Sequence, residues 1–229
     1  SEGVGKNMGK IIVIEGTDSS GKETQSKLLL EQFLSQGRKA RKLSFPNYSS
    51  PACEPVKMYL AGEFGLDAEK VNPYPVSAMY AIDRYASYQK DWGYDYQQED
   101  MLFIADRYVP SNMIHQASKL QGEEKEHYLS WLETLEYEQF QIPRPDFVIF
   151  LDMPTKQAQE LMRERKNKMT GESAKDIHEN NQEYLEKSYQ NACDMAERYH
   201  WIRISCVDGE RIKSMEEIQK EIWEKVREV

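Results

Sequence analysis

The run of residues 16–24 constrains the fold of this chain more than any other feature. It reads Gly-Thr-Asp-Ser-Ser-Gly-Lys-Glu-Thr and separates an apolar stretch, 11–14, from a segment, 22–34, with apolar residues behind a polar first turn. The two glycines allow a tight turn that aims several N–H groups at one anion, and a helix N-terminus adds partial positive charge. Lys22 can reach the outer phosphates of a nucleoside triphosphate. The pattern predicts a strand, a phosphate-binding loop and a helix.

Glu23 departs from the common form of this loop, in which Ser or Thr follows the lysine and binds Mg²⁺. A carboxylate here could ligate the metal, hold a metal-bound water, or belong to a site in which ATP and other carboxylates hold the metal. Alternatively, Glu23 faces solvent in the first turn, where acidic residues are favoured, and Thr24 supplies the hydroxyl. We expect Glu23 to contact the metal.

Composition and charge limit the remaining possibilities. A chain of 229 residues that is 39% hydrophobic suits one globular domain. The excess of 39 acidic over 30 basic residues argues against non-specific nucleic-acid binding, although it permits a local phosphate pocket. Three widely spaced cysteines indicate neither a disulfide framework nor a zinc site, and no apolar run approaches the ~18 residues of a membrane span. We expect a flexible tail over 1–8, one domain over 9–229, no membrane partner and a cytoplasmic location.

Short apolar runs alternate with helical patterns along the rest of the chain. The predicted strands are 42–45, 102–106, 147–152 and 201–206, and the predicted helices lie near 54–61, 75–91, 123–141, 155–165, 176–198 and 214–228. This alternation predicts a three-layer α/β fold, with a parallel sheet of about five strands covered by helices on both faces. Ligands bind such sheets at the carboxyl ends of the strands.

Several short motifs follow these strand ends or lie on the helices between them. They are Glu15-Gly16-x-Asp18, Phe45-Pro46-x-Tyr48, Asp83-Arg84, Asp106-Arg107-Tyr108 and Asp176-x-x-Glu179. In this order and spacing they resemble the thymidylate kinase family of P-loop nucleoside monophosphate kinases. The resemblance runs from about Gly9 to the C-terminal helix. It implies a P-loop fold with a helical lid, ATP as phosphoryl donor, dTMP as acceptor, Mg²⁺ as cofactor and a homodimer.

The resemblance assigns roles to the polar residues nearest the phosphates. Asp18 would accept a hydrogen bond from the 3′-hydroxyl of the acceptor sugar; capping its own loop is the alternative. Arg107 would bridge the donor and acceptor phosphates, and it could also pair with Asp106. Asp106 would hold Mg²⁺ through water or orient Arg107. Because the acceptor phosphate already carries an anionic oxygen near neutral pH, no general base is required.

A second group of residues would recognise thymine. Tyr80 and Arg84 share one helical face, so the ring can stack on the base while the guanidinium donates to O4; packing is the alternative for Tyr80. Asn112 would hydrogen-bond the edge of the base, and Gln116 would bind the substrate. His115 stands where some relatives carry a tyrosine that crowds a ribose 2′-hydroxyl, which leaves discrimination between deoxyribose and ribose open. We assign His115 no catalytic role.

Three residues after the second strand would shape the acceptor pocket. Phe45, together with the adjacent Pro46, would form part of its wall, or alternatively a buried corner between strand and loop. Tyr48 can donate its hydroxyl to the substrate. Asn47 stands where many relatives carry arginine, so one positive contact to the acceptor phosphate is missing.

The segment 163–171 is the main basic cluster of an acidic chain and corresponds to the lid, about 163–175. Since Ser19 occupies a loop position where some relatives carry a basic residue, the catalytic arginine should come from the lid. Arg163 or Arg165 would stabilise the transferring phosphoryl group. A solvated basic helix end is the alternative. Asp176 and Glu179 would orient the lid arginines or the nucleotide, or form an exposed capping pair.

The sequence therefore predicts a kinase that converts dTMP to dTDP, with Lys22, Arg107, Arg163 and Arg165 in catalysis. The predicted ATP phosphate-binding residues are Gly16, Ser19, Ser20, Gly21, Lys22, Glu23 and Thr24. The predicted substrate-binding residues are Asp18, Phe45, Tyr48, Tyr80, Arg84, Arg107, Asn112 and Gln116, and the candidate metal ligands are Glu23 and Asp106. Two alternatives remain: a kinase for another or several nucleoside monophosphates, and a non-catalytic nucleotide-binding module in which Glu23 has abolished transfer.

Overall fold

A five-stranded parallel sheet forms the centre of the computed structural model, which describes residues 8–98, 100–168, 177–178 and 181–229. The strands are β1 (Lys10–Glu15), β2 (Ala40–Ser44), β3 (Leu102–Asp106), β4 (Phe147–Asp152) and β5 (Ile202–Ser205). Their order across the sheet is β2-β3-β1-β4-β5. The prediction of about five parallel strands is confirmed. Most of the predicted N-terminal tail, the lid residues from 169 to 175, and the predicted pair Asp176 and Glu179 lie outside the described residues.

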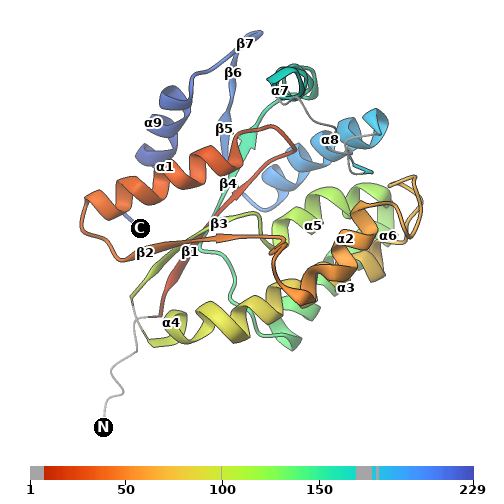
Figure 1. Cartoon of the computed structure of the whole chain (residues 1–229), viewed down its shortest axis with the longest axis horizontal. Helices are drawn as coiled ribbons and strands as arrows, with labels where there is room; N and C mark the ends of the chain where they lie inside the picture. Colours follow the sequence, from red (N-terminus) through yellow and green to blue (C-terminus); the bar gives the residue numbers. More distant parts are fainter. Residues whose placement is uncertain (1–7, 99, 169–176, 179–180) are drawn as a thin grey trace.

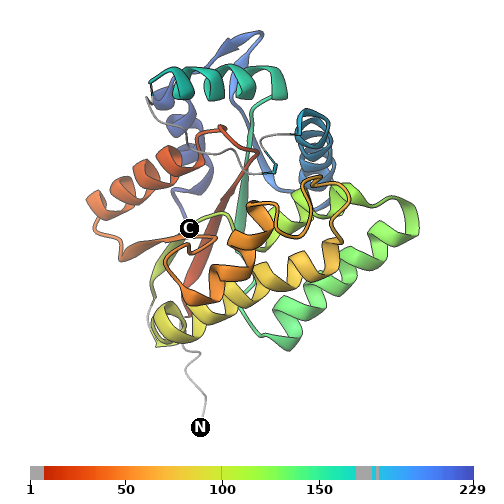
Figure 2. The ribbon, with the colours of Figure 1, turned by 45° about the vertical axis from the view of Figure 1, so that its right-hand side comes forward.

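Helices cover both faces of the sheet (Figure 1). On one face lie α1 (Lys22–Ser35) and α9 (Met215–Val226), which contact each other. The opposite layer contains α2 (Glu54–Leu60), α3 (Pro73–Ser87), α4 (Gly93–Gln98), α5 (Val109–His115), α6 (Gly122–Glu133) and α8 (Gln182–Arg198). The remaining helix, α7 (Thr155–Lys168), crosses the carboxyl-terminal edge of the sheet, as the turned view in Figure 2 also shows.

The central strand explains why this architecture needs two helical layers. In β1, Ile11 and Val13 belong to the core on the α3–α6 side, whereas Ile12 and Ile14 belong to the core on the α1–α9 side. All four side chains are fully buried. Because successive side chains of a strand point to opposite faces, a continuous apolar run is stable only when both faces are covered.

Two predicted helices contain or continue into π-helical stretches that we did not predict. The helix predicted over 75–91 is α3, followed without a break by a π-helical stretch, η2 (Tyr88–Trp92), and then by α4. The helix predicted over 123–141 ends as α6 at Glu133 and continues as a second π-helical stretch, η4 (Thr134–Gln139). A π-helical turn changes the residue spacing only over a few positions. A helical pattern read over the whole segment therefore does not reveal it.

Other elements differ from prediction more plainly. The predicted helix start at 176 is wrong, since residues 177–178 form a turn and α8 begins at Gln182. There the side chain of Asn181 caps the helix by accepting a hydrogen bond from the N–H of Tyr184. We did not predict α5, nor the hairpin of β6 (Val207–Asp208) and β7 (Arg211–Ile212). The two-residue strands are too short to produce a periodic signal.

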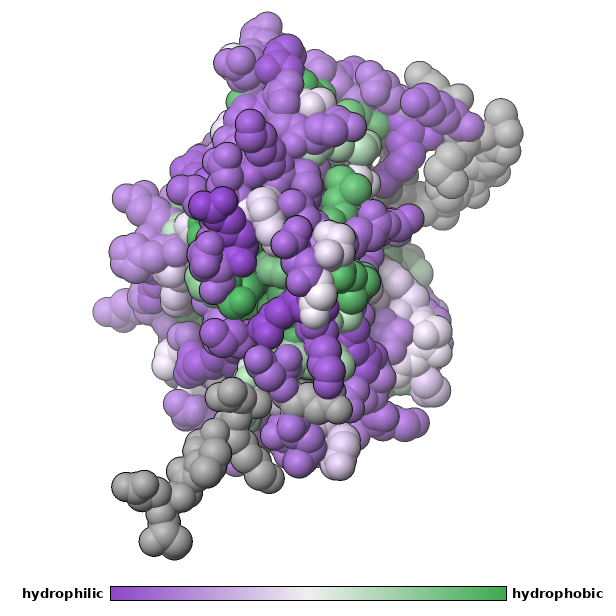
Figure 3. All heavy atoms as spheres, turned by 90° about the vertical axis from the view of Figure 1, so that its left-hand side faces the viewer, coloured by the Kyte–Doolittle hydropathy of each residue, from purple (hydrophilic) through white to green (hydrophobic). Residues whose placement is uncertain are grey.

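The molecular surface is mainly hydrophilic on the face shown in Figure 3, where apolar side chains appear only in small separate areas. Within the described ranges, no helix combines the length and the apolar character needed to cross a bilayer.

Candidate active site

The loop between β1 and α1 is shaped by close backbone approaches. A Cβ atom on Gly16 would lie 2.4 Å from Oγ of Ser20 and 3.1 Å from the carbonyl oxygen of Leu151, so only glycine fits there. Gly21 and Ser19 have positive φ angles of 92° and 62°. Because α1 follows without a side-chain cap, the first N–H groups of the helix are available to an anion.

Lys22 opens α1 and lies almost entirely within the loop. Its Nζ donates to the carbonyl oxygen of Thr17 at 2.8 Å and to Oγ of Ser20 at 3.4 Å. Burial, reinforced by the charge of Arg107, lowers the pKa of Lys22 to about 8, although Asp18 and other nearby carboxylates oppose the shift. The ammonium group is therefore held ready for an anion by neutral oxygens of the loop.

We expect ATP binding to weaken above the pKa of Lys22. The charged ammonium binds phosphate, so the dissociation constant for ATP should be lowest below pH 8 and should rise roughly tenfold per pH unit above it. Equilibrium titration of ATP without dTMP, between about pH 7 and about pH 9, measures this. Lys22→Arg keeps the charge throughout this range and should give a flat profile; an identical rise in that variant would contradict the assignment.

The larger of two adjoining cavities, about 670 Å³, extends from this loop toward α9. Its polar end is formed by residues 18–25, and its other walls come from α7, the β6–β7 hairpin and the start of α9. The residues beyond the loop are Met153, Leu161, Arg165, Ile212, Lys213, Ser214, Met215 and Ile218. A phosphate-binding end joined to a mostly apolar wall suits a nucleotide.

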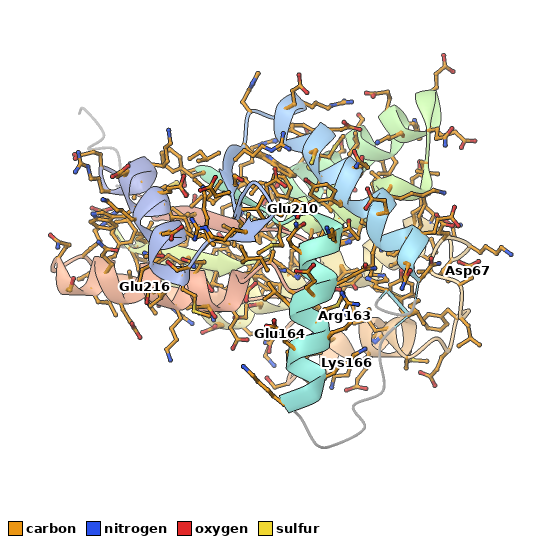
Figure 4. All side chains as sticks on the ribbon, turned by 90° about the horizontal axis from the view of Figure 1, so that it is seen from above. Asp67, Arg163, Glu164, Lys166, Glu210 and Glu216 are labelled. Atoms are coloured by element: carbon orange, nitrogen blue, oxygen red, sulfur yellow. The ribbon has the colours of Figure 1, made fainter. Side chains whose placement is uncertain are left out.

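The two predicted lid arginines occupy different positions on α7. Arg165 lines the larger cavity, whereas Arg163 is exposed and does not line it within the part of the chain that the structure describes. Figure 4 labels Arg163 on the side of α7 that faces α8, and Glu164 on the side that faces α1. The nucleotide side of α7 thus carries Arg165, and the other side carries Arg163.

The smaller cavity, about 70 Å³, lies on the other side of the loop. Its lining residues come from the phosphate loop, the β2–α2 loop, α2, α3, the β3–α5 turn, α5 and its end, and the turn before α8. They are Asp18, Pro46, Tyr48, Leu60, Tyr80, Arg107, Ser111, Asn112, His115, Gln116 and His178. Asp18 belongs to the walls of both cavities. The two cavities therefore meet at the phosphate loop.

Arg107 lies at this junction in a left-handed backbone conformation, with φ of 67°. Its Nη2 donates to Oδ1 of Asp18 at 2.8 Å. Burial alone would raise the pKa of Asp18, but Arg107 and Lys22 outweigh it and hold that pKa well below its usual range. The alternative partner Asp106 has no ion pair with Arg107 among the described salt bridges.

Glu15 fixes the turn that presents Arg107. Its fully buried carboxylate accepts the N–H of Tyr108 at 2.9 Å and the hydroxyl of Ser111 at 2.7 Å. Burial raises the pKa of Glu15, while Arg107 and these two hydrogen bonds oppose the rise. The left-handed residue between β3 and α5 is thus anchored from β1.

Arg84 lies behind the smaller cavity and contacts it through Asn112. Its Nε and Nη2 form a bidentate pair with Glu136, each at 2.7 Å, and Nη2 also donates to Oδ1 of Asn112 at 2.8 Å. Arg84 is 2% exposed and Glu136 is fully buried. The predicted direct contact of Arg84 with a base stays a prediction, because the guanidinium is absent from the described cavity lining.

The model of the thymidylate kinase family matches residues 14–222. The chain belongs to the thymidylate kinase family. It is 30% identical to the thymidylate kinase of Mycobacterium tuberculosis over 183 residues, which cover 78% of this chain and 81% of that protein. The thymidylate kinase of Schizosaccharomyces pombe is 31% identical over 150 residues, covering 65% and 63%. The solved thymidylate kinase of Candida albicans shares the fold, with a TM-score of 0.66, 19% identity, and coverage of 96% and 92%.

The remaining predicted acceptor residues of this thymidylate kinase family member are divided between cavity and core. Tyr48 and Tyr80 line the smaller cavity, and the ring of Tyr80 meets Tyr59 edge-on at 6.4 Å. Phe45 is instead 6% exposed and packs on Tyr108, with ring centroids 5.8 Å apart. Of the two residues predicted to form the wall, Pro46 lines the cavity, whereas Phe45 takes the alternative position in the buried corner between strand and loop.

Two amides in this cavity have unused hydrogen-bonding atoms. Asn112 uses its oxygen to accept from Arg84, and Gln116 uses its nitrogen to donate to Tyr59 at 3.4 Å. The other atoms, Nδ2 of Asn112 and Oε1 of Gln116, are buried without a partner among the described residues. The cavity thus offers one spare donor and one spare acceptor.

Sequence reasoning gave no definite role to several polar residues of this thymidylate kinase site. Glu15 was read only as part of a motif, Ser111 was named without a role, His115 was considered only for discrimination between deoxyribose and ribose, and His178 was not considered. His115 and His178 are two of only four histidines in the chain, which is a weak signal. Their contact joins positions far apart in the sequence, which no local pattern reveals.

The two candidate metal ligands stand near the phosphate site as single carboxylates. Glu23 is exposed and lines the larger cavity, and Asp106 is half-buried at the end of β3. Within the described ranges, no group of three or more His, Cys, Asp or Glu side chains could form a metal cage. This arrangement fits Mg²⁺ bound mostly by phosphate oxygens and water, with one or two carboxylates from the protein.

Proposed function

We propose that this chain transfers the γ-phosphoryl group of ATP to dTMP and forms dTDP. The observation that carries the proposal is the junction of the two cavities at Asp18, with Arg107 bonded to it. A donor nucleotide in the larger cavity and an acceptor monophosphate in the smaller one would bring their phosphates together at that point. The thymidylate kinase family membership supports this arrangement.

Transfer in such a site depends on position and charge. The acceptor oxygen is already anionic near neutral pH, so no residue has to remove a proton. Lys22 would neutralise the outer phosphates of ATP, and Arg107 would bridge donor and acceptor. Arg165, on the wall of the larger cavity, is the stronger candidate for the lid arginine that stabilises the transferring group. Arg163 would need movement of α7 to reach it.

The unused amide atoms support a pyrimidine base with an imide edge. Thymine offers carbonyl oxygens on either side of one N–H, which complements a spare donor on Asn112 and a spare acceptor on Gln116. Tyr80 would stack on the base, and Arg84 would hold the Asn112 amide in its orientation. Thymine recognition would then be direct through Asn112 and indirect through Arg84.

Mg²⁺ is the proposed cofactor, and Glu23 and Asp106 are the proposed contacts of the metal or its water. We expect Glu23→Thr to change the concentrations of Mg²⁺ and Mn²⁺ that give half-maximal turnover, because a hydroxyl replaces a charged ligand. Steady-state rates across a metal titration measure this. Glu31→Thr, on the same helix, is the control; equal metal dependence in wild type and Glu23→Thr would contradict the role of Glu23.

A homodimer is also proposed for the chain. Ile82 and Tyr85, three positions apart on α3, are 46% and 39% exposed and line neither of the two cavities, so they are candidate apolar contacts of a dimer. Sedimentation of the purified protein would determine its oligomeric state. The cytoplasmic location stays a prediction.

The substrate range is tested by ATP-dependent formation of diphosphate from dTMP, dUMP, UMP, dCMP, dGMP and dAMP at saturating Mg²⁺. A strong preference for dTMP supports the proposal and the roles of Tyr80 and Asn112. Preference for another monophosphate would place the error in the base pocket. ATP binding without any turnover would instead favour the non-catalytic module, which the family relationship and the retained Lys22 and Arg107 do not favour.

A further inference from the structure

The guanidinium of Arg107 is held at both of its ends, by different kinds of acceptor. Nη2 pairs with the carboxylate of Asp18 at 2.8 Å, whereas Nη1 lies 3.2 Å from Nε2 of His115 and 3.3 Å from the hydroxyl of Ser111. Nη1 also lies 3.4 Å from the carbonyl oxygen of Gly16. The acceptors around Nη1 are therefore all neutral oxygens or nitrogens.

The contact with Arg107 determines the protonation of His115. A guanidinium has only donors, so Nε2 of His115 must accept, and the ring proton must be on Nδ1. Burial, followed by the charge of Arg107, lowers the pKa of His115 well below its usual value. A neutral imidazole orients the arginine without cancelling its charge, which a carboxylate at the same place would do.

A second histidine packs against the ring of His115. The ring of His178 stacks on it, with centroids 5.7 Å apart and planes at 21°. Nε2 of His178 bonds the hydroxyl of Tyr59 at 2.8 Å, and the ring of His178 packs against Tyr184 at 4.8 Å. Burial lowers the pKa of His178 to about 4, so both stacked rings are neutral near pH 7 and do not repel each other.

The backbone around His115 is restrained as well. Its carbonyl oxygen accepts a hydrogen bond from the hydroxyl of Tyr184 at 2.8 Å. Its Nδ1, which carries the proton, is buried without a partner among the described residues. A buried donor without a partner lowers stability. The observed ring orientation therefore keeps the contact of Nε2 with Arg107 at the cost of a hydrogen bond from Nδ1.

We propose that His115 is a positioning residue for Arg107, whose imidazole Nε2 aims the guanidinium at the junction of the two cavities, and that the stacked His178 fixes the imidazole. This inference rests on the proposed function, because it assigns His115 an effect only through Arg107. The effect should be confined to the acceptor phosphate and to the transfer step.

His115→Leu and His115→Gln separate positioning from packing. Leucine fills similar space without an acceptor, whereas the glutamine amide oxygen can reach the place of Nε2. We expect His115→Leu to lower kcat for dTMP about tenfold and to raise the KM for dTMP, with the KM for ATP unchanged. His115→Gln should recover most of the loss. A glutamine variant as impaired as the leucine variant would overturn the proposal.

The decisive measurement repeats both substitutions in an Arg107→Ala background. If His115 acts through Arg107, neither substitution should lower kcat by more than about twofold there. An equal loss in both backgrounds would overturn the proposal. Arg107→Ala alone tests the proposed function separately, since unchanged turnover in that variant would remove Arg107 from the reaction.

Thermal unfolding of every variant identifies any that fail to fold. In that case His178→Phe supplies a second probe, because phenylalanine keeps the ring contact with His115 but loses the hydrogen bond to Tyr59.

Discussion

Arg107→Ala is expected to lower kcat for dTMP about a thousandfold, with a much smaller effect on ATP affinity. The guanidinium stands where the two cavities meet, within 2.8 Å of Asp18, and no other arginine among the described residues lines the smaller cavity. The substitution removes a positively charged guanidinium, which can donate two hydrogen bonds, from the point where the two phosphates would approach each other. Steady-state kinetics with dTMP, together with equilibrium ATP binding, separates the two effects.

Two further variants make this result specific. Arg107→Lys keeps one charge but loses the planar fork, so its kcat should lie between those of the wild type and Arg107→Ala. Arg41→Ala removes an arginine on β2 that pairs with Asp91 outside both cavities, and it should leave kcat unchanged. Equal losses in Arg41→Ala and Arg107→Ala would show that the effect comes from general electrostatics.

Glu136→Leu is expected to lower the free energy of unfolding by about 3–5 kcal/mol. Glu136 is fully buried and pairs with Arg84, which is 2% exposed, so the substitution would leave a buried guanidinium without its carboxylate. Urea unfolding monitored by circular dichroism measures the change. The double variant Arg84→Met, Glu136→Leu removes both charges and should recover much of the loss.

An exposed ion pair provides the comparison for this prediction. Lys57 and Glu54 on α2 are 3.0 Å apart but 40% and 62% exposed, so Lys57→Ala should change stability by less than about 1 kcal/mol. A loss in Glu136→Leu as small as in Lys57→Ala would mean that water reaches Arg84. Since Arg84 also orients Asn112, the double variant should additionally show weaker discrimination among bases if that amide reads thymine.

The sequence was sufficient for features that depend on neighbouring residues. The apolar run of β1, the two glycines and Lys22 are adjacent in the chain, and they define strand, loop and helix together. Arg107 could be predicted because it follows a strand whose end must lie beside the phosphate loop in a parallel sheet. The larger cavity was therefore foreseeable at its phosphate end.

The smaller cavity depends on contacts that local pattern does not contain. Arg84 pairs with Glu136, 52 positions away, inside a π-helical stretch, and His178 bonds Tyr59, 119 positions away. From the sequence, Arg84 looks like a cation available to a ligand. Its carboxylate partner, Glu136, lies in a different helical segment, so no local pattern indicates the pair. Tyr80 lines the smaller cavity as the helix spacing predicted, whereas Arg84 lies deeper than expected, paired with Glu136.

At Ser19, the proposed phosphate-binding role and stability favour different residues. It adopts a left-handed backbone conformation, which costs a non-glycine residue about 1 kcal/mol, and its hydroxyl is buried without a partner among the described residues. Glycine would relieve both costs, but it would also remove a hydroxyl from the wall that should meet the phosphates. Random mutagenesis followed by selection for heat resistance alone should therefore enrich Ser19→Gly. Selection for growth that requires the enzyme's activity should remove the same variant.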